Sequence, residues 1–169
     1  MARIARERGP STGLGPGADQ RALDVAMGRG RHALPLAQAG FRTFGVDIRV
    51  DAVREAIASG RSAGVEIHGW CADLTQHPLP RERFDLVVVC RYLQRDLFDD
   101  LRAAVTPGGI VIYETFTTKQ RDLGRPPASA DHLLEPDELR RRFDGFELLC
   151  YEEVAMPDAV ARLVARSRR

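Results

Sequence analysis

Lysine is almost absent from this sequence of 169 residues: Lys119 is the single one, and arginine supplies nearly all of the positive charge. Neither sign of charge is in excess, because 25 basic residues face 24 acidic ones and the formal net charge at pH 7 is +1. A dedicated nucleic-acid-binding protein normally carries a basic excess. The charge balance argues against that class, and we expect no nucleic-acid partner.

Cysteine is scarce as well. The three residues Cys71, Cys90 and Cys150 are odd in number, and none belongs to a Cys-x-x-Cys or Cys/His spacing typical of zinc sites. Each lies in an apolar or strand-like context. We therefore expect buried free thiols, a reducing compartment and no metal site.

Long apolar runs are also missing, and no stretch has the length of a signal peptide or a transmembrane helix. The hydrophobic content of 44% and the charged content of 29% are those of a soluble globular protein. These features predict a cytoplasmic protein with no membrane partner. The oligomeric state stays open.

The chain length predicts one domain with its own core. Residues 1–20 hold many glycines and prolines and almost no apolar periodicity, which predicts a flexible N-terminal arm. Residues 21–169 form the expected domain.

Within residues 21–169, strand and helix signals alternate. Strands are expected at Ala22–Met27, Thr43–Ile48, Val65–Cys71, Phe84–Cys90 and Ile110–Phe116, with a terminal hairpin of Phe146–Val154 and Ala161–Ala165. Helices are expected at Arg31–Ala39, at Val50–Ser59 with Gly60 as the stop, along the apolar stripe Leu93, Leu97, Leu101 and Val105, and at Glu135–Phe143. Thr117–Leu134 is expected to be a polar loop. The alternation predicts an α/β fold, a doubly wound sheet of Rossmann-like type.

The most informative stretch is residues 22–34, a short apolar strand followed by a glycine turn and the start of a helix. Gly28 and Gly30 allow a sharp turn and a close ligand approach. The free N–H groups of the following helix suit an anionic group. Asp24 lies in the strand, and a buried carboxylate there needs a partner. Together these residues suggest a nucleotide-type ligand that also carries a cationic group.

Further candidates lie at the ends of three later strands, where open α/β sheets bind their ligands: Asp47, Asp73 and Cys90-Arg91-Tyr92. Asp47 comes 19 residues after Gly28, a spacing that suits an acceptor for ribose hydroxyls, although it could also cap the helix that begins at Val50. Asp73 could accept from an adenine amino group or serve only as a turn residue. Trp70 is either a core residue or an adenine wall, and the core is favoured.

These residues resemble the class I S-adenosylmethionine-dependent methyltransferases over nearly the whole domain. Asp24-Val25-Ala26-Met27-Gly28-Arg29-Gly30 is similar to their glycine motif, Asp47 and Asp73 match their ribose-binding and adenine-binding acids, and Pro107-Gly108-Gly109 resembles the turn before their fifth strand. Gly28-Arg29-Gly30-Arg31-His32-Ala33 and Tyr113-Glu114-Thr115-Phe116 look most like a small bacterial branch related to tellurite-resistance and thiol methyltransferases. The resemblance implies strand order 3-2-1-4-5-7-6, with the last strand antiparallel.

The resemblance also implies S-adenosyl-L-methionine as the cofactor and a set of residues around it. The expected cofactor-binding residues are Asp24, Ala26, Gly28, Gly30, His32, Asp47, Ile48, Ala72, Asp73, Leu74 and Cys90. The expected residues at the substrate mouth are Arg91, Tyr92 and Glu114. A sulfonium donor is already activated, so in-line methyl transfer needs alignment more than proton shuttling.

Two departures from the family pattern concern the turn. Ala26 stands where the family usually has its first glycine, and Met27 where it has a small residue or cysteine. We expect Ala26 to keep a negative φ. The N-terminal arm also lacks the aromatic helix that commonly caps the cofactor.

The acceptor is expected to be a small molecule. No Asn/Asp-Pro-Pro-Tyr follows the fourth strand, which disfavours amide or exocyclic amine methylation, and no inserted domain is present to grip a macromolecule. The loop Thr117–Leu134 is the expected lid, and its Arg121 and Arg125 favour an anionic substrate weakly. Soft nucleophiles, metalloid oxyanions and small carboxylates all stay open.

Two other functions compete with this one. A cofactor-binding or degenerate methyltransferase-fold module with a regulatory or scaffolding role would share the same motifs. A NAD-dependent dehydrogenase would need Gly-x-Gly-x-x-Gly, but Ala26, Gly28 and Arg31 occupy those places. A P-loop is excluded because no Gly-Lys-Ser/Thr occurs.

Overall fold

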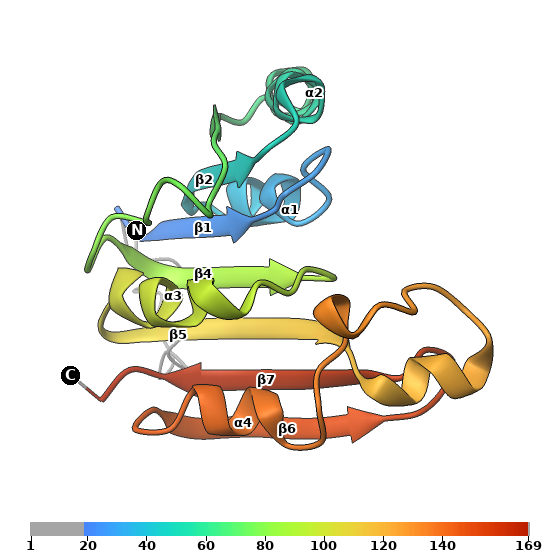
Figure 1. Cartoon of the computed structure of the whole chain (residues 1–169). Helices are drawn as coiled ribbons and strands as arrows, with labels where there is room; N and C mark the ends of the chain where they lie inside the picture. Colours follow the sequence, from blue (N-terminus) through green and yellow to red (C-terminus); the bar gives the residue numbers. More distant parts are fainter. Residues whose placement is uncertain (1–18, 169) are drawn as a thin grey trace, which may run out of the picture.

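The computed structural model describes residues 19–168, which form a seven-stranded sheet with helices on both faces (Figure 1). The strand order is β3-β2-β1-β4-β5-β7-β6, and β7 runs antiparallel to both of its neighbours. The predicted doubly wound sheet and its order are therefore confirmed.

The strands are β1 (Arg21–Val25), β2 (Arg42–Asp47), β3 (Ile67–Cys71), β4 (Phe84–Cys90), β5 (Val105–Phe116), β6 (Glu147–Val154) and β7 (Val160–Arg166). The α-helices are α1 (Ala33–Gln38), α2 (Val50–Ser62), α3 (Phe98–Ala104) and α4 (Glu138–Arg142), and the 3-10 helices are η1 (Arg95–Leu97), η2 (Thr118–Leu123) and η3 (Ala130–His132).

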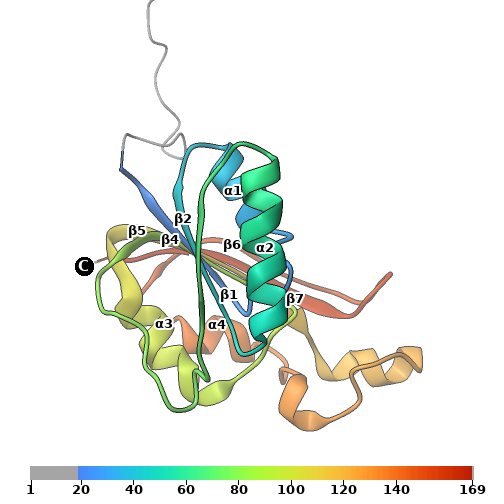
Figure 2. The ribbon, with the colours of Figure 1, turned by 90° about the horizontal axis from the view of Figure 1, so that it is seen from above.

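Helices α1 and α2 cover one face of the sheet, and α3 and α4 cover the other (Figure 2). The central strands are buried on both sides, which accounts for the continuous apolar run of β4. On the α3/α4 face, Phe98, Tyr113 and Phe143 pack ring against ring, with centroids 5.6–6.2 Å apart. This aromatic cluster is the centre of the main core.

Met27 belongs to the core on the other face. Its side chain lies over two glycines of the neighbouring strands, since a Cβ added at Gly45 would stand 2.0 Å from the Met27 sulfur and one at Gly69 would stand 3.0 Å from its methyl. Val53 of α2 packs against the same methionine cluster. The departure at Met27 is therefore a packing residue, 4% exposed.

Several predicted boundaries are wrong. Helix α2 runs through the buried Gly60 and ends near Gly64, which takes the positive φ of +73°. Helix α4 begins three residues after the predicted Glu135. Strand β5 starts at Val105, so Pro107-Gly108-Gly109 lies within it. The four residues of the predicted apolar stripe are buried, as expected. They do not belong to one helix, because Leu93 precedes η1 and Val105 is the first residue of β5.

The cysteines also differ from the prediction. All three are free thiols, but Cys71 and Cys150 are exposed and Cys90 is half-buried. Cys71 lies at the end of the edge strand β3, and Cys150 lies on the other edge strand β6, so neither has a neighbouring strand on one side. Across residues 19–168, no helix is long and apolar enough to span a membrane.

A partly buried ion pair joins Glu138, the first residue of α4, to Arg95 in η1. Glu138, 7% exposed, receives two hydrogen bonds from Arg95, from Nε at 2.8 Å and from Nη2 at 2.9 Å. Arg95 also donates to the Leu133 carbonyl oxygen at 2.8 Å. Burial alone would raise the pKa of Glu138, but the bonds from Arg95 and the Glu135 N–H outweigh it and hold that pKa below its usual value.

We expect Glu138→Ala to lower the free energy of unfolding by about 2 kcal/mol, because it removes two charge-assisted hydrogen bonds from Arg95. The matched control is Glu147→Ala, whose exposed pair with Arg166 at 3.2 Å contributes less than about 1 kcal/mol. Urea unfolding at pH 7 measures both variants. Equal losses in the two variants would contradict the assigned role of Glu138.

Candidate functional site

The carboxyl ends of β1, β2, β3, β4 and β5 meet at one edge of the sheet, and the loop between β5 and α4 extends beyond that edge (Figure 1). Parallel strands bring residues far apart in sequence to this edge. The register pairs Val25 with Val46 and Val89, so the segments that follow these strands lie side by side. All the predicted site residues come from these segments or from the ends of the strands.

The glycine turn after β1 has three residues with positive φ: Ala26 at +54°, Gly28 at +53° and Gly30 at +82°. The expectation of a negative φ at Ala26 is wrong, and the alanine takes a left-handed conformation that costs about 1 kcal/mol or more. Gly30 is needed for packing as well, since an added Cβ would stand 2.8 Å from the Ala56 Cβ of α2. At Gly28 an added Cβ meets nothing within 4 Å, so this side of the turn is open.

Asp24 is 1% exposed and connects β1 to α1. Its Oδ2 accepts a hydrogen bond from the Ala33 N–H at 2.9 Å. Its other oxygen accepts none from residues 19–168. Burial raises the pKa of this carboxyl to about 7, although the Ala33 bond and the charge of Arg31 act against the shift. A ligand cation is the partner that would favour its ionised form.

The first N–H group of α1 was predicted to face an anionic ligand. It is already used, because the Ala33 N–H donates to Asp24. The Gly28 N–H is taken as well, by Asp47. The N–H groups of Arg31 and His32 donate to nothing in the described part of the chain. These amides belong to the turn rather than to α1, and they are able to donate to a carboxylate.

Asp47 holds the turn against β2. Its Oδ2 accepts from the Gly28 N–H at 2.8 Å and its Oδ1 from the Arg49 N–H at 2.9 Å. The N-cap residue of α2 is Arg49, which immediately precedes Val50. The alternative in which Asp47 is the N-cap of that helix is therefore wrong. Each carboxylate oxygen keeps a lone pair for a ligand hydroxyl.

A cavity of about 420 Å³ lies beside Asp47. Its wall is formed by six of the predicted cofactor-binding residues, one residue predicted for the substrate mouth, and three residues that were not predicted. The predicted ones are Ala26, Asp47, Ile48, Ala72, Asp73, Leu74 and Tyr92, and the others are Val46, Thr75 and Gln94. Gln94 could not be found from a motif, because its place depends on a hydrogen bond with the Tyr92 hydroxyl.

Ile48 and Asp73 occupy the rim of this cavity in different ways. Ile48 is 66% exposed, an unusual position for an isoleucine that a flat ligand would cover. Asp73 accepts from the Thr75 N–H at 2.9 Å and the Thr75 hydroxyl at 2.7 Å, which lowers its pKa. The turn role predicted for Asp73 is therefore confirmed, and its Oδ2 accepts no hydrogen bond from residues 19–168. Trp70 does not line this cavity.

Five of the predicted cofactor residues do not line this cavity: Asp24, Gly28, Gly30, His32 and Cys90. The two glycines form the turn beside it. His32 is half-buried, and burial followed by the charge of Arg31 lowers its pKa, which favours the neutral imidazole. Asp24 lies under the same turn, outside the cavity wall.

A second cavity, of about 390 Å³, adjoins the first through Tyr92. Its wall joins residues after β4 to the end of β5 and the following loop: Arg91, Tyr92, Leu93, Thr115, Phe116, Pro126, Pro127 and His132. The buried Tyr113 hydroxyl donates to the Tyr92 carbonyl oxygen at 3.0 Å and fixes the backbone between the two cavities. The Tyr113 ring itself packs in the core.

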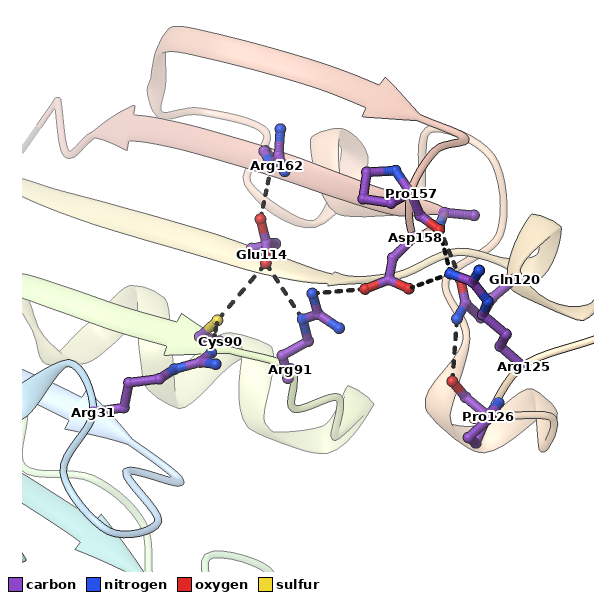
Figure 3. A network of polar contacts seen from close by, with 11 residues as sticks. Arg31, Cys90, Arg91, Glu114, Gln120, Arg125, Pro126, Pro157, Asp158 and Arg162 are labelled. Atoms are coloured by element: carbon purple, nitrogen blue, oxygen red, sulfur yellow. Dashed lines mark hydrogen bonds and ion pairs between the residues drawn. The ribbon is translucent and has the colours of Figure 1, made fainter. Parts of the chain in front are cut away.

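A chain of charges runs along the second cavity, from the glycine turn to the loop after β5 (Figure 3). Glu114 is at its centre and pairs with Arg162 at 2.7 Å and with Arg91 at 3.5 Å. Burial would raise the pKa of Glu114, but the two arginines outweigh it and lower that pKa. Arg91 has a φ of +58°, lies 4.5 Å from the Phe116 ring centroid and pairs with Asp158 at 2.9 Å.

Cys90 stands between Arg31 and Glu114, with its sulfur 3.5 Å from the Arg31 guanidinium and 3.8 Å from the Glu114 carboxylate. Burial and the charge of Glu114 raise the pKa of the thiol. A neutral thiol is a poor nucleophile. The surroundings of Cys90 therefore do not favour a role as a nucleophile.

The loop between β5 and α4 is more ordered than the predicted polar loop, since it contains η2 and η3. Gln120 is 1% exposed and joins two segments, donating to the Pro126 carbonyl oxygen at 3.1 Å and accepting from the Ala159 N–H at 2.8 Å. The loop arginines have structural partners: Arg121 donates to the Ala128 carbonyl oxygen at 3.0 Å, and Arg125 to the Pro157 carbonyl oxygen at 2.9 Å. They give no support to an anionic substrate.

The strand order and the paired cavities define the class of this protein: a doubly wound α/β protein with a nucleotide-type site at the carboxyl edge of its sheet. Residues 22–109, more than half of the chain, match the family model described as a methyltransferase domain. The chain therefore belongs to the methyltransferase family. No curated protein sequence matches this chain.

Solved structures agree on the fold. TehB from Haemophilus influenzae superposes with a TM-score of 0.73 at 18% identity, and the match covers 89% of this chain and 58% of that one. An S-adenosylmethionine-dependent methyltransferase from Mesorhizobium loti gives 0.72 at 20% identity, with 89% and 93% covered. The [4+2]-cyclase SpnF gives 0.72 at 18% identity, with 89% and 75% covered. The chain thus spans little more than half of TehB, and at these identities the likeness shows the fold alone.

Proposed function

We propose that this methyltransferase transfers a methyl group in line to a small molecule held in the 390 Å³ cavity. The observation that carries the proposal is Tyr92, which lines both this cavity and the 420 Å³ cavity beside Asp47. A donor in one cavity and an acceptor in the other would meet at this residue. Alignment of two reactants is the main requirement of a displacement on an activated donor.

The chain's residues suit S-adenosyl-L-methionine in its size, its hydroxyls and its charges. Asp47 offers lone pairs to ribose hydroxyls, and Ile48 offers an exposed apolar surface to a flat base. The unpartnered oxygen of Asp24 suits an ammonium, and the free amides of Arg31 and His32 suit a carboxylate. When bound, this cofactor supplies an electrophilic methyl group on a sulfonium.

The acceptor cavity would position a small substrate rather than activate it strongly. Phe116, Pro126 and Pro127 supply apolar contacts, and the arginines nearby are already paired with Glu114 and Asp158. His132 is exposed and contributes an imidazole to the lining. A volume of 390 Å³ suits a small molecule, and only a terminal group of a macromolecule would fit into it.

The test has two stages. Calorimetry with S-adenosylhomocysteine should detect binding, whereas NAD should not bind. Methyl transfer from S-adenosylmethionine is then assayed over a panel of thiols, metalloid oxyanions and small carboxylates. Turnover with any member, lost at least tenfold in Tyr92→Ala, supports the proposal.

SpnF is described as a cyclase and carries the same fold, so the fold does not by itself require methyl transfer. Binding of S-adenosylhomocysteine without turnover over the whole panel would favour a cofactor-binding module instead. Turnover that Tyr92→Ala leaves unchanged would contradict the placement of the acceptor.

A further inference from the structure

A third cavity, of about 470 Å³, lies on the sheet face away from α1 and α2, beneath the segment that joins β3 to β4. Its wall is mostly aromatic and aliphatic, with Phe44, Trp70 and Phe84 from three strands and Pro78, Leu79 and Pro80 from the connecting segment. No helix occurs between β3 and β4. The rings of Phe44 and Trp70, each half-buried, are therefore covered only in part.

The rings of this cavity are held in place by their neighbours. Phe44 packs edge-on against Phe84, with centroids 5.7 Å apart, and stacks on His68 at 4.9 Å. Leu79 and Phe84 are 4% and 3% exposed, so the floor is fixed by the main core. The indole N–H of Trp70 donates to no group in residues 19–168 and is free for a ligand. Preformed apolar walls of this kind favour a flat hydrophobic ligand.

The charge around the cavity has one sign. Arg21 and Arg83 line it, and Arg42 lies beside it with its guanidinium 5.6 Å from the Phe44 ring centroid. None of the three guanidinium groups pairs with a carboxylate of residues 19–168, and no aspartate or glutamate lines the cavity. Elsewhere arginines such as Arg91 and Arg162 have acidic partners.

Two acidic residues next to this cavity, Asp85 and Glu66, have partners other than the three guanidinium groups. Asp85 accepts from the backbone N–H of Arg21 at 2.8 Å and from the Thr106 hydroxyl at 3.1 Å. Glu66 pairs with His68 at 3.6 Å. Three unpaired arginines around an aromatic cavity match a ligand that is flat, apolar and anionic.

We propose that this cavity is a second ligand site and that it binds a small aromatic carboxylate, separately from the cofactor. The ring would lie against Trp70 and Phe44, and the carboxylate would face Arg21 and Arg83. Leu74 is the one residue that lines both this cavity and the one beside Asp47, so the two sites have separate binding surfaces. Residues 1–18 are unsuited as an occupant by their charge, since they hold Arg3, Arg6 and Arg8 against the single acidic Glu7.

The protein contains one tryptophan, so the fluorescence of Trp70 reports this cavity directly. Titration with 3-phenylpropionate should give a saturable change in that fluorescence, with a dissociation constant on the order of 1 mM or tighter. The neutral analogue 3-phenylpropionamide should bind about tenfold more weakly, since it lacks the charge that the arginines recognise. The change should persist in saturating S-adenosylhomocysteine.

Variants test the assigned contacts. Arg21→Gln and Arg83→Gln should each weaken 3-phenylpropionate about fivefold or more and leave the binding of S-adenosylhomocysteine unchanged. The matched control is Arg54→Gln on α2, which is exposed on the opposite face and should have no effect. The proposal is overturned by equal binding of the amide, by unchanged binding in both variants, or by loss of the response with S-adenosylhomocysteine. S-adenosylhomocysteine binding measured alone tests the cofactor site independently.

Discussion

Replacing Asp47 with alanine is expected to weaken the binding of S-adenosylhomocysteine about 100-fold, measured by calorimetry at pH 7.5. The carboxylate would accept two ribose hydroxyls, and a hydrogen bond to a charged group contributes about 1.5 kcal/mol or more. Two such bonds correspond to roughly two orders of magnitude in affinity. The same carboxylate binds the Gly28 N–H at 2.8 Å, so the variant also loosens the turn beside the ligand.

Asp51→Ala is the matched control for this effect. Asp51 lies four residues further on, is exposed, and pairs only with the neighbouring Arg49. Its removal is expected to change the affinity less than twofold. Unfolding curves for Asp47→Ala establish that the variant is folded. A folded Asp47→Ala protein that binds within twofold of the wild type would refute the assignment of the ribose site.

The sheet could be predicted from the sequence because its strands have strong local signals. Phe84–Cys90 is bounded in the structure as predicted, since seven consecutive residues with few polar side chains fit only a strand covered on both faces. The acids at the strand ends followed from the same reasoning, because parallel strands deliver their last residues to one edge. Asp47, Ala72 and Asp73 come together for that reason.

What could not be predicted depends on contacts between distant segments. Gln120 looks like any polar loop residue, yet its amide joins Pro126 and Ala159 and is fully buried. Gly60 resembles a residue that ends a helix. In the structure its missing Cβ lets Ile67 of β3 pack closely against α2, and the helix continues to Ser62. Local propensity gives way to packing at both positions.

The glycine turn after β1 has a backbone conformation that the sequence did not predict. Nothing local requires Ala26 to adopt a φ of +54°, and a Cβ disfavours it. The conformation is held by the neighbouring contacts, because the Met27 N–H donates to the Val46 carbonyl oxygen at 3.0 Å and the Met27 side chain fills the space over Gly45. Strain at a ligand-binding turn is common where the surrounding structure over-determines the backbone.

Asp24→Asn is expected to change how stability depends on pH more than any other substitution considered. The pKa of the wild-type carboxyl is raised by burial from 3.8 to about 7. The folded state therefore binds this proton more tightly than the unfolded chain does. The stabilisation that results is complete below pH 4 and is lost as the pH rises to about 7. A shift of this size corresponds to roughly 4 kcal/mol.

Asparagine cannot ionise, so the stability of Asp24→Asn relative to the wild type should rise by a few kcal/mol between pH 4 and pH 8. Its side-chain oxygen can still accept from the Ala33 N–H, which keeps the contact with α1. Urea unfolding at a series of pH values measures the difference between the two proteins. Parallel curves for the two proteins across this range would show that Asp24 does not titrate there.

The same carboxyl should couple the proton to the ligand. At pH 7 about half of the wild-type molecules hold the proton on Asp24, because its pKa is about 7. An ammonium beside the unpartnered oxygen would favour the ionised form, so binding of S-adenosylhomocysteine should release roughly half a proton at this pH. Calorimetry in buffers of different ionisation enthalpy measures that release. Asp24→Asn should release none and bind at least about tenfold more weakly, because the ammonium loses a charged acceptor. Equal proton release by the two proteins would place the ammonium elsewhere.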